Sequence, residues 1–183
     1  TPNLKCLYLS LEVHDHLIYR RFMQIANGMS KEDVVELHSV DRDEELRKAI
    51  LPIEHINIMT TAPEIGSMKQ LIIELAPKIV VIDTIDVIKS NYINDPFNKM
   101  EKIVNELKQL AVQESIIIIG VSHISKGASF EQKLSVHSAK GNSVIEQKAD
   151  KVIGIMGDRE STRRIVKALK SRDESRFQLA FTF

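Results

Sequence analysis

Two polar residues at the ends of apolar stretches mark where this chain could do chemistry. Asp83 ends the stretch KIVVID (residues 78–83), and His123 ends SIIIIGVSH (residues 115–123). A carboxylate such as Asp83 can hold a magnesium ion beside a nucleotide, directly or through water. A histidine on the next strand can sense the terminal phosphate. The two residues together therefore indicate a nucleotide site, provided that the fold brings them to one place.

Apolar stretches of this kind also predict the fold that would do so. Both are typical of strands that are buried on both faces of a parallel sheet. In open parallel sheets, ligands bind just beyond the carboxyl ends of the strands, so we expect Asp83 and His123 to lie on that edge. A third apolar run, residues 4–11, predicts another buried strand, which ends at Glu12.

Strand and helix patterns alternate along the rest of the chain. Strands are predicted at residues 4–11, 56–60, 78–83, 115–123, 151–156, 164–170 and 176–183. Helices are predicted at residues 14–27, from Ser30 onward, and at 41–51, 65–76, 96–111 and 144–148. The last two strands are expected to pair as an antiparallel hairpin. This order implies an α/β fold with a mainly parallel sheet, flanked by helices and followed by a C-terminal hairpin.

Short signals set the expected helix ends. Gly28 is expected to end the first helix, because glycine readily adopts the left-handed conformation found there. Ser30 and Asp33 form a capping box that opens the second helix. Asp95 and Pro96 suit the N-cap and first position of helix 96–111.

The composition excludes several broad classes of protein. The 25 Lys and Arg residues balance 25 Asp and Glu residues, so any contact with nucleic acid must be local. The single cysteine, Cys6, cannot form an internal disulfide, which favours a reducing cytoplasmic compartment or, for a phage or viral protein, an intracellular one. No apolar run approaches the roughly 20 residues that span a bilayer, so no membrane partner is expected.

Taken in order, several motifs resemble those of a known family. They are LYLSLE at residues 7–12, KIVVID, GVSHIS at 120–125, GNSVIEQKAD at 141–150 and VKALKSRDESRFQLAF at 166–181. Each motif alone is ordinary, because an acid after a buried strand is commonly a cap and a charged hairpin tip is commonly just exposed. Their order and spacing are similar to those of the RecA-fold ATPase domain of DnaB-type replicative helicases and phage primase-helicases.

This resemblance implies roles for the residues that match the motifs of the family. Glu12 matches the glutamate that polarises the attacking water, and Ser10 in the same segment is expected to bind the nucleotide. Asp83 matches the Walker B aspartate, which is associated with magnesium directly or through water. His123 matches the sensor of the terminal phosphate. The implied cofactors are ATP and Mg²⁺.

The resemblance also implies contacts with other molecules. Lys170 and Arg172 match a K-x-R pair that reaches the γ-phosphate held by a neighbouring subunit, which is why such an ATPase forms a homo-oligomeric ring. A long polar loop, residues 125–141, would hold single-stranded DNA, although lysines in such a loop are otherwise an ordinary solvated surface. The DNA contacts are expected from Lys126, Lys133, Lys140 and Gly141. The implied function is the ATPase core of a DnaB-like DNA helicase that couples ATP hydrolysis to translocation.

One departure from the family pattern limits this interpretation. The family uses G-x-x-x-x-G-K-[ST], whose backbone N–H groups and lysine cradle the phosphates, and the sequence contains no such stretch. We expect residues 1–183 to form a single RecA-like domain that lacks its first β-α unit, as an excised domain, a truncated gene product or a degenerate relative would. The chain alone is then expected to be inactive and to expose a long apolar sheet edge.

Two other classes of function remain open. One is a regulatory ATPase of the RecA/KaiC kind, which acts on proteins rather than DNA. The other is a non-catalytic interaction module without a P-loop. The zero net charge mildly favours both alternatives, whereas the order of the motifs favours the helicase.

Overall fold

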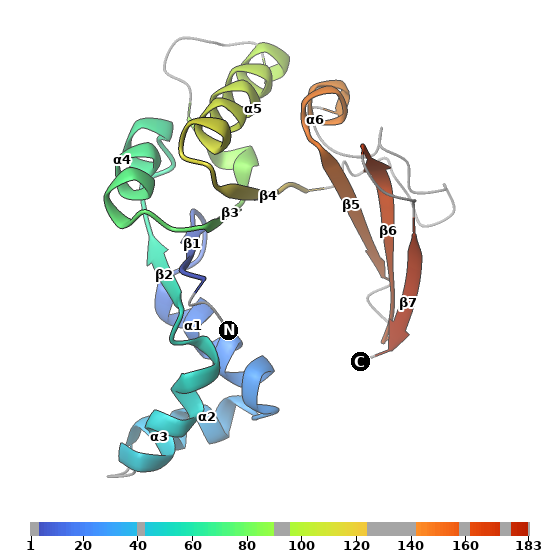
Figure 1. Ribbon diagram of the computed structural model, residues 1–183. Coiled ribbons are helices and arrows are strands. Elements are labelled where there is room, and N and C mark those ends of the chain that lie inside the picture. Colours follow the sequence, from blue (N-terminus) through green and yellow to red (C-terminus); the bar gives the residue numbers. More distant parts are fainter. Residues whose placement is uncertain are drawn as a thin grey trace. The chain divides into compact units, whose positions relative to one another are not determined.

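The computed structural model describes residues 4–39, 43–89, 96–123, 142–157, 162–172 and 177–182. Its internal contacts divide the chain into two compact units. The first consists of Thr1–Lys89 and Leu110–Val121, and the second of Ser90–Gln109 and Ser122–Phe183. Figure 1 shows the elements of both.

A four-stranded parallel sheet forms the centre of the first unit. Its strands follow the order β2-β1-β3-β4. They are β1 (Cys6–Ser10), β2 (Ile56–Thr60), β3 (Ile79–Asp83) and β4 (Ile117–Val121). In the register of the sheet, Ser10 is paired with both Thr60 and Asp83, and Asp83 is paired with Val121. All four strands therefore end at the same level, which produces one shared edge.

The two central strands are buried as their apolar sequences predict. Leu7 and Leu9 of β1, and Val80 and Ile82 of β3, are completely inaccessible to solvent. The edge strand β4 differs, because Ile117 is 60% exposed although its sequence is equally apolar. Within the described sheet β4 pairs with β3 alone, and this leaves its other side open.

Helices connect the strands of the first unit. They are α1 (Asp15–Asn27), α2 (Lys31–Ser39), α3 (Asp43–Ile50) and α4 (Ile65–Leu75), with short 3₁₀ turns η1 (Leu51–Ile53) and η2 (Ile85–Val87). Gly28 ends α1 in the left-handed conformation, with φ of 64°, as predicted. The predicted capping box is confirmed too, since Ser30 Oγ accepts from the backbone N–H of Asp33, and Asp33 accepts from that of Ser30.

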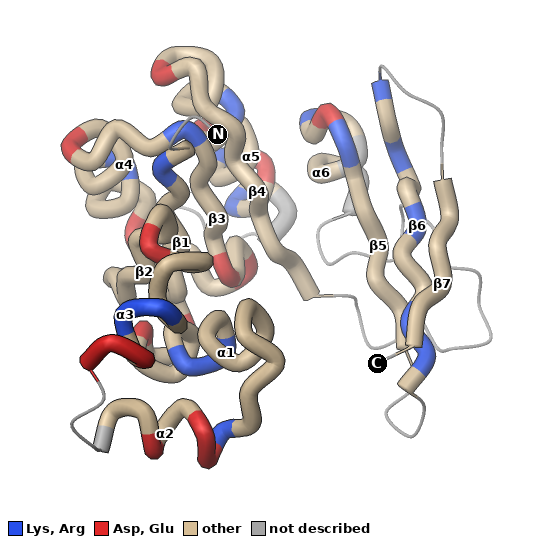
Figure 2. The backbone as a smooth tube through the Cα atoms, turned by 60° about the horizontal axis from the view of Figure 1, so that its bottom comes forward, with Lys and Arg blue, Asp and Glu red and all other residues tan. Residues whose placement is uncertain are grey.

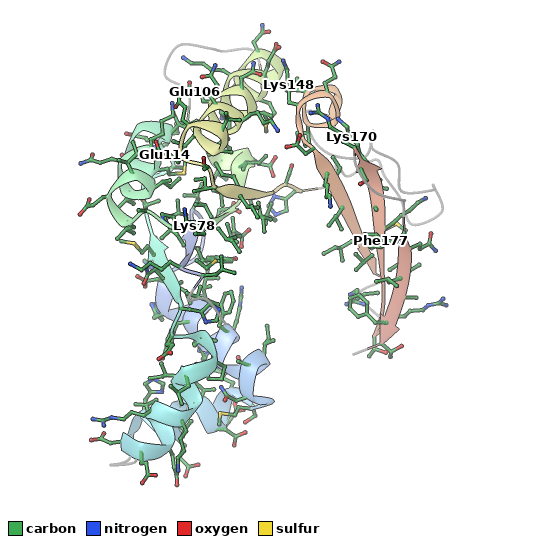
Figure 3. The ribbon with its side chains drawn as sticks, in the orientation of Figure 1. Lys78, Glu106, Glu114, Lys148, Lys170 and Phe177 are labelled. Atoms are coloured by element: carbon green, nitrogen blue, oxygen red, sulfur yellow. The ribbon has the colours of Figure 1, made fainter. Side chains whose placement is uncertain are left out.

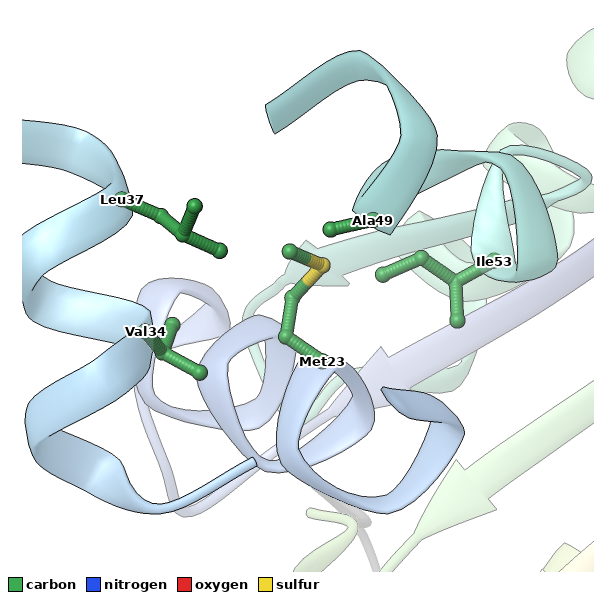
Figure 4. Packing of buried hydrophobic residues seen from close by; sticks show 5 residues of the cluster. All are labelled: Met23, Val34, Leu37, Ala49 and Ile53. Carbon is green, nitrogen blue, oxygen red and sulfur yellow. The ribbon is translucent and has the colours of Figure 1, made fainter. Parts of the chain in front are cut away.

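A separate apolar cluster stabilises the helical part of the first unit. Met23 of α1 is completely buried at its centre. Figure 4 shows its side chain among those of Val34 and Leu37 from α2, Ala49 from α3, and Ile53 from η1. This cluster packs the three helices against one another, and Ile56 at the amino end of β2 packs against it.

The second unit contains a separate antiparallel sheet. Its strands follow the order β5-β6-β7, and two helices accompany it. The elements are β5 (Lys151–Gly157), β6 (Arg163–Ser171), β7 (Gln178–Thr182), α6 (Asn142–Lys148) and α5 (Pro96–Gln113), whose last turn belongs to the first unit. Figure 2 shows basic residues along β6 and none on β7.

The predicted fold class is confirmed, with one refinement. The sheet that precedes the hairpin is parallel, and β6 and β7 pair antiparallel as expected. However, β5 does not extend the parallel sheet, because it pairs antiparallel with β6 and makes the hairpin three-stranded. A strand pattern in the sequence gives the direction of side chains but not the choice of partner strand, so this pairing was not predicted.

Candidate functional site

The carboxyl ends of β1 and β3 are fastened together by the backbone. Ser10 and Asp83 are register partners, and the N–H of Leu11 donates to the carbonyl of Asp83 over 2.7 Å. This bond continues the pairing one residue past the end of β1. Glu12, the next residue, is therefore held beside the end of β3, on the same edge of the sheet as Asp83.

Asp83 receives a direct hydrogen bond from a tyrosine on the neighbouring strand. The hydroxyl of Tyr8 lies 2.5 Å from Oδ2 of Asp83. Tyr8 lies two residues before Ser10, so its side chain emerges on the same face as that of Asp83. The ring of Tyr8 packs edge-to-face on Phe22 of α1, with 5.4 Å between the ring centroids. The orientation of the Asp83 carboxylate is thus fixed by a side chain that is itself packed.

Burial raises the pKa of Tyr8 above its ordinary value, and the hydrogen bond to Asp83 raises it further. Both effects favour the neutral hydroxyl, which is the form that donates. Tyr8 therefore remains a donor to Asp83 throughout the neutral pH range.

Glu12 is held by a hydroxyl that lies just after the end of β3. The hydroxyl of Thr84 donates to Oε2 of Glu12 over 3.3 Å. Thr84 is only 3% exposed, whereas Glu12 is exposed. Tyr8 of β1 thus holds the carboxylate of Asp83 at the end of β3, and Thr84, just after β3, holds that of Glu12, two residues after β1. These bonds keep Glu12 and Asp83 at one edge of the sheet, and Glu12 is exposed to solvent.

Ser10, a predicted nucleotide contact, is buried. Its Oγ accepts from the backbone N–H of Val13 over 3.2 Å and donates to the carbonyl of the same residue. These bonds shape the turn that carries Glu12. The hydroxyl is thus engaged within the turn, and its contact with nucleotide stays a prediction.

The end of β2 contributes to the same edge. Oγ1 of Thr60 accepts from the backbone N–H of Asp15 over 2.8 Å. The residue before α1, His14, provides no capping side chain, so this bond satisfies one of the unpaired N–H groups at the start of the helix. The start of α1 is in this way anchored next to the turn of Glu12.

His123 follows the end of β4 by two residues and is exposed. It belongs to the second unit. Its role as a phosphate sensor stays a prediction. The expected DNA contacts Lys126, Lys133, Lys140 and Gly141 lie outside the described residues.

Lys170 and Arg172, the predicted K-x-R pair, lie at the end of β6, and Lys170 is labelled in Figure 3. Both donate to the backbone carbonyl of Gln147 in α6, Nζ of Lys170 over 3.3 Å and Nη2 of Arg172 over 3.2 Å. Nη1 of Arg172 also lies 3.0 Å from Oδ1 of Asp150. The pair is therefore gathered at one place in the second unit.

Asp150 is held from a second side by α5. Nζ of Lys108 donates to Oδ2 of Asp150, the oxygen that Arg172 does not use. The hydrogen bond from Lys108 is the largest effect and lowers the pKa of Asp150. Burial opposes it, and the charges of Lys108, Arg172 and Lys170 lower the pKa further. Asp150 is thus kept ionised between two cations.

Comparison with known proteins identifies the family of this chain. A family model described as an AAA domain matches residues 1–129. The chain belongs to this AAA domain family. No sequence among the curated proteins matches it.

Two solved structures share the fold of this AAA domain. One, described as an ATPase domain, superposes with a TM-score of 0.79 at 21% sequence identity, over 97% of this chain and 70% of that one. A DnaB-like replicative helicase, solved to show its interactions with primase, gives a TM-score of 0.77 at 19% identity, over 97% of this chain and 48% of that one. These likenesses confirm the predicted resemblance at the level of the fold.

The strand ends of the AAA domain offer the kind of ligands that Mg²⁺ prefers. Glu12 and Asp83 present carboxylate oxygens there, whereas the hydroxyls of Ser10 and Thr84 are buried and already bonded. Within the described residues, no three His, Cys, Asp or Glu side chains gather into a metal cage. Mg²⁺ commonly binds through one or two carboxylates together with waters and substrate phosphates, so this donor set fits a nucleotide-associated magnesium.

Tyr8, Thr84 and Asp150 were not identified as site residues from the sequence. Tyr8 lies inside a buried strand, where an aromatic residue is expected in the core. Thr84 follows Asp83 directly, and only the folded structure shows that its hydroxyl donates to Glu12.

None of the helices in the described part of the chain has the length and apolarity that a membrane span requires.

Proposed function

We propose that this AAA domain is the ATPase core of a ring-forming, DnaB-like DNA helicase that couples ATP hydrolysis to translocation on single-stranded DNA. The observation that carries the proposal is the position of Glu12 and Asp83 at one edge of the parallel sheet, each held by a hydroxyl from the other strand. Ligands of open parallel sheets bind at this edge. The likeness to a solved ATPase domain and to a DnaB-like replicative helicase supports the choice of reaction.

In the proposed reaction, Glu12 orients the attacking water and accepts its proton. Its exposed carboxylate leaves room for a water, while the bond from Thr84 limits its rotation. Asp83 would hold Mg²⁺ directly or through a bound water, using the oxygen that Tyr8 leaves open. Magnesium, when bound, neutralises the charge that develops on the phosphate oxygens.

The remaining roles belong to a second subunit and to the DNA. Lys170 and Arg172 would donate to the γ-phosphate held by the adjacent copy, so that each site is complete only in a ring. His123 would sense the terminal phosphate of the nucleotide and couple its state to the predicted loop 125–141. This loop would contact the DNA backbone through Lys126, Lys133, Lys140 and Gly141.

Stimulation of ATP hydrolysis by single-stranded DNA tests the proposal in the natural full-length protein. We expect single-stranded DNA to stimulate ATP hydrolysis. Lys140→Ala should weaken both this stimulation and the affinity for DNA, while basal hydrolysis is unchanged. Lys31→Ala, a change on the exposed start of α2, is the matched control and should have no effect. A rate of ATP hydrolysis that does not change on addition of DNA would favour a regulatory ATPase. The absence of hydrolysis would favour a non-catalytic module. Either result contradicts the proposal.

A further inference from the structure

The end of α6 provides a ready acceptor for the K-x-R pair. Gln147 lies in the last turn of this helix, and its backbone carbonyl accepts hydrogen bonds from both Lys170 and Arg172. The last carbonyls of a helix have no partner inside the helix and form the negative end of its dipole. Cationic side chains are therefore favoured at this position, and two of them converge there from β6.

Asp150 adds a full negative charge two residues beyond α6. One of its oxygens accepts from Arg172 and the other from Lys108 of α5. The carboxylate is thereby fixed from two sides and cannot rotate without losing one partner. Arg172 is held by a charged and a backbone acceptor together, Oδ1 of Asp150 at 3.0 Å and the carbonyl of Gln147 at 3.2 Å.

This arrangement orients Arg172 without using all of its N–H donors. The guanidinium has five N–H donors, and these two bonds use one on each terminal nitrogen. Arg172 and Asp150 are also half exposed, and exposed ion pairs contribute little to stability. Such a pair reduces the number of rotamers that Arg172 samples, yet it leaves donors for a phosphate and yields to a stronger ligand.

We infer that Asp150, assisted by the end of α6, is the positioning residue of the Lys170–Arg172 pair, and that it presents these cations toward the phosphate of the neighbouring subunit. The inference rests on the proposed function. It connects two motifs that are far apart in the sequence, GNSVIEQKAD and the K-x-R element, by contacts between their side chains and backbone.

The first test compares Asp150→Ala and Asp150→Asn in the natural full-length protein. A misplacement of about 1 Å can cost about a hundredfold in rate, so we expect Asp150→Ala to lower kcat by roughly tenfold to a hundredfold with little change in the KM for ATP. Asp150→Asn retains an acceptor for Arg172 and should recover part of this loss. Glu44→Ala removes an exposed carboxylate paired with Lys48 and is the matched control, with kcat unchanged.

The second test mixes variants within one ring. Asp150→Ala subunits keep Glu12, whereas Glu12→Gln subunits keep a well-placed Arg172. A mixture should form some complete sites and hydrolyse ATP faster than either variant alone. A purely structural defect in the Asp150→Ala subunit would give no such rescue, and thermal unfolding of each variant checks that it folds.

The outcomes separate the two proposals. If Arg172→Ala lowers kcat and is rescued by mixing, but Asp150→Ala has full activity or is not rescued, the positioning role of Asp150 is wrong and the proposed function stands. If Arg172→Ala itself leaves hydrolysis unchanged, the trans-acting role of the K-x-R pair fails, and the inference fails with it.

Discussion

In the first unit Asp83 accepts a hydrogen bond from the neutral hydroxyl of Tyr8, whereas in the second unit Asp150 lies between the cations Lys108 and Arg172. The first pair is half-buried and packed against Phe22, and the second is exposed. A neutral donor inside packed structure fixes a carboxylate at one position. Exposed ion pairs orient long side chains while leaving them able to move.

This difference matches the roles that we propose for the two places. A carboxylate associated with magnesium needs a fixed position, because phosphoryl transfer depends mainly on positioning and charge stabilisation. A cation that must reach another subunit needs a preferred direction and freedom to change partners. Removing each interaction in turn tests whether the two carboxylates differ in this way.

The largest effect is expected from Glu12→Gln, which keeps the shape of the side chain but removes the base. We expect hydrolysis to fall by roughly 10²–10⁴-fold, the usual contribution of a positioned general base, while ATP binding is retained. Steady-state hydrolysis and calorimetric ATP binding by the full-length protein measure the two effects. Glu54→Gln, an exposed change before the amino end of β2, is the control. Unchanged turnover would remove Glu12 from its role.

A smaller effect is expected from Tyr8→Phe, which removes the donor to Asp83 and keeps the ring against Phe22. The free energy of unfolding should fall by about 1.5 kcal/mol, the lower range for a hydrogen bond to a charged group, because the pair is only half-buried. Urea denaturation measures this change.

The same variant should need more metal. A freely rotating Asp83 holds Mg²⁺ less well, so we expect a several-fold rise in the Mg²⁺ concentration for half-maximal hydrolysis and weaker Mn²⁺ binding by electron paramagnetic resonance. Tyr19→Phe on α1 is the matched control, since its ring contacts His38 rather than the strand ends. Equal metal dependence in the Tyr8→Phe and wild-type proteins would show that Tyr8 does not position Asp83.

Acid should destabilise the second unit by protonating Asp150. The pKa of this carboxyl is lowered, first by the hydrogen bond from Lys108, so its pairing stabilises the unit fully above the unfolded pKa of about 4. The stabilisation is lost as the pH falls through the lower folded pKa. NMR signals of the Asp150 carboxyl and the Arg172 side chain should titrate together below about pH 4. An Arg172 signal that stays constant while Asp150 protonates would contradict the contact.

Salt gives the smallest and most selective difference. At about 1 M ionic strength the Debye length falls to about 3 Å, which screens exposed pairs far more than half-buried ones. The Nε–H signal of Arg172 should move toward that of free arginine, whereas the hydroxyl of Tyr8 should keep its exchange protection. Equal sensitivity of the two would remove the distinction between the units.

Much of the fold could be predicted from local pattern. The apolar runs that end at Asp83 and near Glu12 form the buried parallel strands β3 and β1, since residues buried on both faces leave an unbroken apolar sequence. Gly28 and the Ser30 capping box placed helix ends because both act through their own backbone. The partner of β5 was not predictable, because many strands can satisfy the same backbone groups.

The candidate site was predictable in its charged members and not in their partners. Glu12 and Asp83 were identified from the order and spacing of the motifs that contain them, since an acid after a buried strand is ordinary by itself. Tyr8 and Thr84 act through contacts across β1 and β3, and these depend on register, which the sequence alone does not give. Asp150 was recognisable only as part of a motif, since its link to Arg172 joins elements that are distant in the chain.

In the proposed function, Glu12 and Asp83 face one bound nucleotide at the end of the parallel sheet. A crystal structure of the natural full-length protein with Mg²⁺ and a non-hydrolysable ATP analogue would show where the nucleotide binds. We expect the metal beside Asp83, directly or through one water, and the γ-phosphate in front of Glu12. A nucleotide bound away from the carboxyl ends of β1 and β3 would contradict the account.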